Sequence, residues 1–212
     1  MGKYSDQIKS NELTPPKDKI VVIGEDYISN EPTSYTVKYK NNYLAIEVFD
    51  SNGKKCFKTK SKMCGIGISD MNDEDILYFN ENSIPSVKLI SKKEDEKEIA
   101  RISGKNTTTQ HHKYKVEFTN KTNEICQIIN VHCSSTYRSV GVFNGNEKEG
   151  APMICRMINN SKSTSFDRVY EAYTSEYTIE IAPNVDNLLM IALMIYIMTE
   201  KMFYARMLHH HH

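Results

Sequence analysis

The sequence contains no tryptophan and carries no net charge, because 27 basic side chains balance 27 acidic ones. A zero balance argues against a dedicated nucleic-acid-binding protein, which usually carries a basic excess. The missing tryptophan does not preclude a core, since 13 tyrosines, 7 phenylalanines and 10 methionines remain. Hydrophobic residues at 39% and charged residues at 25% are typical of one soluble globular domain and not of a disordered chain.

Secretion and disulfide signals are also missing. The first 20 residues are polar and contain no apolar stretch, so no signal peptide is expected. The five cysteines are odd in number and widely spaced, which indicates reduced thiols in an intracellular protein. We therefore expect a cytoplasmic protein with peripheral membrane contact. The cysteines are Cys56, Cys64, Cys126, Cys133 and Cys155.

Catalytic and cofactor motifs are absent as well. No HExxH, GxSxG, CxxC or P-loop pattern occurs, and Gly65–Asp70 lacks the third glycine of a dinucleotide-binding loop. His132 and Cys133 are neighbours, so on a strand they point to opposite faces and cannot act as base and nucleophile. We predict no enzyme, no cofactor and no metal site.

The acidic segment Asp70–Glu81 resembles a calcium-binding EF-hand loop only in part. Acidic or amide residues fall at loop positions 1, 3, 5 and 12, but position 6 is Asp75 where the sharp turn requires glycine. The motif therefore fails as an EF-hand. A weak calcium contact of another kind and an acidic loop running into a strand both stay open.

Short segments with a period of two dominate from Lys19 to Ile181. In Lys113–Phe118 and Glu176–Ile181, apolar and polar residues alternate, which is typical of antiparallel strands with one buried face. Asn52-Gly53 supplies the turn of a hairpin. Twelve such segments are predicted, with 176–181 as a thirteenth: 20–23, 34–40, 43–50, 54–60, 76–79, 86–91, 97–103, 112–119, 124–132, 137–143, 152–158 and 164–171.

The C-terminal region is different in character. Asn187–Thr199 is uncharged and apolar on all sides, so it predicts a helix hidden from water all round. Its 13 residues span about 20 Å at ~1.5 Å per residue, whereas a bilayer core needs roughly 30 Å. A buried core helix is therefore favoured over a membrane span, with Asn184 as its N-cap and Asp186 near its positive end.

Together these patterns predict a mainly β fold: a closed antiparallel barrel of about twelve strands around a central hydrophobic helix at about 184–204. Residues 1–18 are expected to form a flexible polar arm, because they are polar and end in two prolines. The barrel domain is expected to span 19–207. Residues 208–212 are interpreted as the remnant of a purification tag.

The run Glu176–Asp186 with the apolar helix that follows resembles the C-terminal signature of the LURP-one-related family. The hairpin Tyr43–Lys60, with its Asp-x-Asn-Gly turn, and the region Leu77–Lys93 are similar to the early hairpins of that family. The resemblance covers about residues 20–204. It implies a twelve-stranded tubby C-terminal-like barrel, in a group that includes phosphoinositide-binding tubby domains and calcium-dependent phospholipid scramblases.

The best candidate ligand site is a basic strand. Lys58, Lys60 and Lys62 share one face by the period of two, and such a row of ammonium groups suits lipid phosphates. The alternative is a solvated outer face. The side chains that extend the patch, if their hairpin lies alongside, are Lys88, Lys92, Lys93 and Arg101.

The leading hypothesis is a non-enzymatic barrel domain that binds anionic phospholipid or phosphoinositide head groups and serves in signalling, without nucleic acid and without a stable transmembrane segment. One alternative is a protein-interaction or structural scaffold with a protein partner. The other is a scramblase-like, calcium-responsive lipid transporter.

Overall fold

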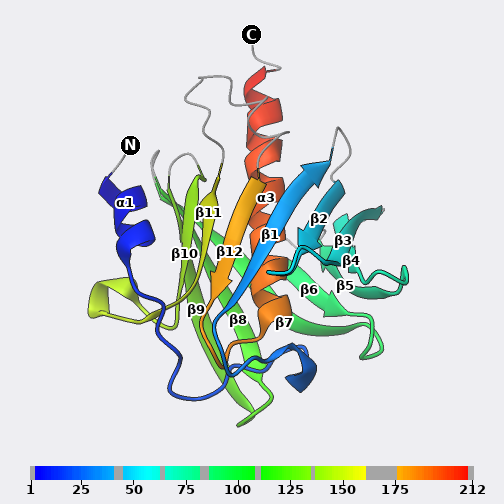
Figure 1. Cartoon of the computed structure of the whole chain (residues 1–212), viewed down its shortest axis with the longest axis horizontal. Helices are drawn as coiled ribbons and strands as arrows, with labels where there is room; N and C mark the ends of the chain where they lie inside the picture. Colours follow the sequence, from blue (N-terminus) through cyan, green and yellow to red (C-terminus); the bar gives the residue numbers. More distant parts are fainter. Residues whose placement is uncertain are drawn as a thin grey trace.

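A closed barrel surrounds one long helix. The described residues form twelve antiparallel strands, and helix α3 runs through the interior that they enclose (Figure 1). The inner side chains of the strands and those of α3 make one hydrophobic cluster. The predicted fold class is therefore confirmed. The computed structural model describes residues 3–40, 45–62, 65–81, 86–107, 111–134, 137–160 and 176–209.

The strands follow one another around the barrel in chain order, and β1 closes it by pairing with both β2 and β12. Their bounds are β1 Thr33–Lys40, β2 Ala45–Phe49, β3 Lys55–Lys62, β4 Gly65–Ser69, β5 Asp75–Asn80, β6 Val87–Ser91, β7 Lys97–Thr107, β8 His111–Asn120, β9 Ile125–Cys133, β10 Ser139–Phe143, β11 Met153–Asn159 and β12 Glu176–Ile181. The helices are α1 Lys3–Ser10, α3 Asn187–His209 and two 3-10 turns, η1 Glu25–Tyr27 and η2 Glu147–Glu149.

Helix α3 is buried because its surface is apolar on all sides. Each residue from 188 to 198 is at most 7% exposed. Surrounding strands remove this surface from water, so the prediction of a core helix is confirmed. Within the described part of the chain, no helix has both the length and the apolar character that a membrane crossing requires.

The start of α3 differs from the sequence-based expectation. Asp186 is the N-cap, since its Oδ1 accepts the N–H of Leu189 at 3.0 Å and its carbonyl accepts that of Met190 at 3.2 Å. The prediction of Asn184 as the N-cap is wrong. Asn184 has a φ of 64°, and its backbone bonds to Ser29 and Ile20 instead.

Asp186 also holds the chain that precedes the barrel. Its second carboxylate oxygen, Oδ2, accepts the backbone N–H groups of Val22 at 3.0 Å, Ile23 at 2.7 Å and Gly24 at 3.4 Å. Burial raises the pKa of Asp186, and the N–H donors oppose that rise by stabilising the carboxylate. One side chain thus joins the first turn of α3 to a segment more than 160 residues earlier.

Two of the predicted strands need correction. Residues 20–23 are buried as expected but form no strand, because their N–H groups bond to Asp186 and Asn120 and not to a neighbouring strand. The missing strand is β4, which the glycines of Gly65–Ser69 obscured. Gly65 is needed there: its φ is +141°, and a Cβ would lie 2.3 Å from the carbonyl oxygen of Phe79. The predicted segment 164–171 lies outside the described residues.

The N-terminal arm is partly structured. The sequence analysis expects a flexible arm at residues 1–18, but helix α1 packs on the outside of β10 and β11. Ile8 is fully buried there against Phe143 and Met153, in a small cluster separate from the barrel core. The Arg156 guanidinium donates to the carbonyl of Lys9 at 2.8 Å. The polar composition hid a single apolar side chain that anchors the helix.

We predict that Asp186→Ala lowers the free energy of unfolding by at least about 4 kcal/mol, because it leaves buried N–H donors without an acceptor. Circular dichroism during urea unfolding measures the change. The matched control is Asp70→Ala, whose Oδ1 also accepts two backbone N–H groups but in an exposed turn. That variant should lose about 1 kcal/mol. Equal losses in both variants would contradict the structural role of Asp186.

We predict that Ile8→Asp detaches α1 and leaves the barrel folded, because an eight-residue helix is not stable alone. Hydrogen exchange should show full loss of protection at residues 3–10 and none in the strands. The exposed neighbour Gln7, changed to Asp, is the control and should keep α1 protected. Unchanged protection in Ile8→Asp would show that another contact holds the helix.

Candidate functional site

Strand β3 presents two of the predicted lysines on its outer face. Thr59 lies between them and is buried, with its hydroxyl oxygen accepting the N–H of Ile46 at 2.8 Å. Because strand neighbours alternate, Lys58 and Lys60 point outward. Lys62 is the last residue of β3, and its side chain lies outside the described residues.

Both lysines reach the same acidic oxygen. The Nζ atoms of Lys58 and Lys60 lie 2.7 and 2.9 Å from Oδ1 of Asp73, and Lys60 also donates to the Asp73 carbonyl at 3.1 Å. The hydrogen bonds from Lys58 and Lys60 lower the pKa of Asp73 to about 2, and Asp73 raises the pKa of Lys60. All three groups are therefore charged at neutral pH. The Asp73 side chain is 63% exposed, so solvent screens the pairs and they add little stability.

The sequence analysis missed the role of Asp73, although a signal was present. Asp70-Met71-Asn72-Asp73 repeats the pattern of Asp50-Ser51-Asn52-Gly53, and in both turns the first aspartate accepts two backbone N–H groups. Asp73 stands where the first turn has glycine and has a φ of 66°. The open calcium question thus has an answer in this turn: Asp70 caps the backbone and Asp73 pairs with lysines.

The other basic side chains do not join this site. Strands β4 and β5 separate β3 from the hairpin of β6 and β7, so the hairpin does not lie alongside. Lys88 and Arg101 pair with Glu98 at 3.1 and 2.7 Å. Lys92 pairs with Glu96 and lies 4.9 Å from the ring centre of Tyr78.

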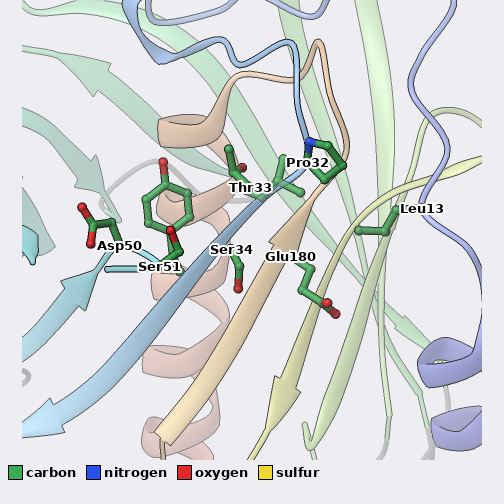
Figure 2. Close-up of a pocket in the computed structure, with 9 residues that line it drawn as sticks. Leu13, Pro32, Thr33, Ser34, Asp50, Ser51 and Glu180 are labelled. Atoms are coloured by element: carbon green, nitrogen blue, oxygen red, sulfur yellow. The ribbon is translucent and has the colours of Figure 1, made fainter. Parts of the chain in front are cut away.

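A cleft of about 310 Å³ lies elsewhere, at the ends of β1 and β12 where α3 begins (Figure 2). Its charged lining residues are both acidic. Asp50 caps its own turn through Oδ1, and Glu180 pairs with Arg156. This lining does not suit an anionic ligand. The remaining lining residues are Leu13, Pro32, Thr33, Ser34, Tyr35, Ser51 and Ile181.

His132 takes part in a structural contact. Its Nδ1 bonds to Glu147, which also accepts the hydroxyl of Tyr4 and so ties α1 to β9. Cys133 is fully buried on the other face, and burial raises the pKa of its thiol well above the ordinary value. The prediction that His132 and Cys133 face opposite ways is confirmed.

No group of three or more metal-ligating side chains comes together among the residues that the structure describes. The lysine pair on β3 with its counterion Asp73 is therefore the candidate site. Its geometry places two ammonium groups around one anionic oxygen. What it offers chemically is recognition of an anion at the protein surface.

The comparisons with known proteins agree with the fold. The family model for LURP-one-related proteins matches residues 33–198. An X-ray structure of a protein from Arabidopsis thaliana is similar with a TM-score of 0.58 at 16% identity, covering 83% of this chain and 95% of that one. At this identity the likeness concerns the fold. No curated protein matches the sequence. Because the family model covers most of the chain, the chain belongs to the LURP-one-related family.

Proposed function

We propose that this protein is a non-enzymatic, peripheral membrane-binding domain that recognises anionic phospholipid head groups, phosphoinositides among them. The observation that carries the proposal is the convergence of Lys58 and Lys60 on one oxygen of Asp73, at 2.7 and 2.9 Å. A phosphate oxygen presents the same negative charge to the same two donors. Asp73 therefore stands in for the ligand when no membrane is present.

The energetics suit a reversible contact. The pairs are exposed to solvent, so exchanging the carboxylate for a lipid phosphate costs little. Each lysine near an anionic leaflet contributes on the order of 1 kcal/mol. The interior of the barrel is filled by α3, which leaves the outer surface for ligands. The phosphoinositide-binding tubby domains, to whose group the family is related, offer a parallel for this mode of binding.

The alternative function, a protein scaffold without lipid affinity, shares the same surface and is separated by experiment. An acidic protein partner would also meet the β3 lysines. The exchange of Asp73 for lipid makes a specific expectation, because removal of this counterion should increase membrane affinity.

We predict that Asp73→Asn strengthens binding to vesicles containing phosphatidylserine or phosphoinositide by about tenfold, since two lysines lose their internal counterion. Asparagine tolerates the positive φ of this position, so the turn is kept. Flotation at about 0.15 M salt measures the bound fraction. Adding Lys58→Gln and Lys60→Gln to this variant should bring binding back to the wild-type level or below.

The matched control is Glu74→Gln, which removes one negative charge from the same exposed turn. It should change binding by less than about twofold, because Lys58 and Lys60 keep Asp73. Equal binding by Asp73→Asn and Glu74→Gln would overturn the assignment of the site. Absence of binding to any vesicle, in every variant, would overturn the proposed function in favour of the protein scaffold.

A further inference from the structure

The two ends of the barrel carry opposite charge. At the start end, α3 begins at Asn187 and β12 finishes; at the exit end, α3 leaves the barrel beyond Thr199 (Figure 1). Because all neighbouring strands are antiparallel, odd-numbered strands finish at the exit end and even-numbered strands begin there. Each charged residue on a strand can thus be placed near one end from its strand position alone.

The exit end is rich in lysine. Within three residues of this end, the strands contain seven lysines and two glutamates. Lys105 on β7 and Lys113 on β8 stand directly opposite each other, an arrangement of like charges that does not stabilise a sheet. The lysines are Lys38, Lys40, Lys60, Lys62, Lys88, Lys105 and Lys113, and the glutamates are Glu47 and Glu176.

The start end has the opposite balance. Its five hairpin connections contain ten acidic and five basic residues. The zero net charge of the chain therefore conceals two ends of opposite sign. The connections are residues 50–54, 70–74, 92–96, 121–124 and 144–152.

The distance between the ends keeps these charges independent. A strand of ten residues such as β8 spans roughly 30 Å at about 3.4 Å per residue. The Debye length is about 8 Å at physiological salt. A charged surface that touches the exit end is therefore attracted by its lysines without being repelled by the acidic turns at the start end.

Helix α3 adds an apolar and aromatic element to the exit end. The helix continues to His209, and the sequence from residue 201 to 207 includes Lys201, Phe203, Tyr204 and Arg206. Aromatic and basic residues together are typical of segments at a membrane–water interface. Burial also raises the pKa of Glu81 and Glu200 at this end, and the charge of Glu81 adds to the rise at Glu200. These two carboxylates thus lose their negative charge more readily than exposed ones.

We infer that the exit end is the face that docks on an anionic phospholipid bilayer, with the barrel axis standing upright and the acidic turns pointing away. The inference rests on the proposed function and adds the orientation and the residues of the contact. Lysines around the rim meet the head groups, and the emerging part of α3 reaches the interface.

The first test compares two triple variants of equal net charge. Lys40→Glu with Lys105→Glu and Lys113→Glu reverses lysines at the exit end and leaves the β3 site intact. The second variant reverses exposed lysines at the start end, and its positions are Lys54, Lys93 and Lys148. With about fivefold affinity for each lysine near an anionic leaflet, the exit-end variant should bind phosphatidylserine vesicles at least about 100-fold more weakly. The start-end variant should stay within about threefold of wild type, and thermal unfolding should show that both are folded.

The second test uses the absence of tryptophan from the chain. Phe203→Trp places a single fluorophore at the exit end, and Met71→Trp places one in an exposed turn at the start end. On addition of anionic vesicles, the emission of Phe203→Trp should shift to the blue and be quenched by brominated lipid. The emission of Met71→Trp should stay unchanged.

The outcomes separate the orientation from the proposed function. If wild-type protein binds anionic vesicles but both triple variants weaken alike, or only Met71→Trp responds, the orientation is wrong while lipid binding stands. A response confined to Phe203→Trp, with weak binding of the exit-end variant alone, supports the orientation. No binding by wild type overturns both.

Discussion

The carboxylate of Asp186 is the constraint on which the rest of the structure depends. It accepts four backbone N–H groups, three from Val22–Gly24 and one from Leu189, in a buried position. The same atoms set the first turn of α3 and anchor the segment that crosses the start end of the barrel. An apolar helix needs such a fixed starting point, because its uniform surface gives the strands no polar feature to define its position along the axis.

The filled barrel then decides where function resides. Twelve strands enclose enough room for a helix, and α3 occupies it with side chains that are apolar on every side. Ligand recognition is left to the outer surface and the rims. On that surface the strand period places Lys58 and Lys60 outward, and the tight turn before β5 brings Asp73 to both of them. The site is thus a consequence of hairpin geometry, and its charges are already ordered before any ligand arrives.

The sequence predicts the parts of this structure that depend on local pattern. Alternation along strands such as Glu176–Ile181, the Asn52-Gly53 turn and the length of the apolar helix together lead to the barrel. What it does not reveal depends on distant partners. The acceptors for residues 20–23 lie far along the chain, and the docking of α1 needs a groove more than 130 residues away from Ile8. The pairing of Asp73 with the lysines needs the register of β3 against β4, which fixes where the turn falls. The separation of charge between the ends likewise emerges only when strand directions are known.

The central claim is that a chain without net charge binds anionic membranes through locally gathered lysines. The most direct test is flotation of the wild-type protein with phosphatidylcholine, phosphatidylserine and phosphoinositide vesicles at about 0.15 M salt. The account predicts binding to the two anionic compositions, none to phosphatidylcholine, and release as the salt concentration rises. Failure to float with any vesicle, or equal binding to neutral and anionic vesicles that salt does not reverse, would contradict it.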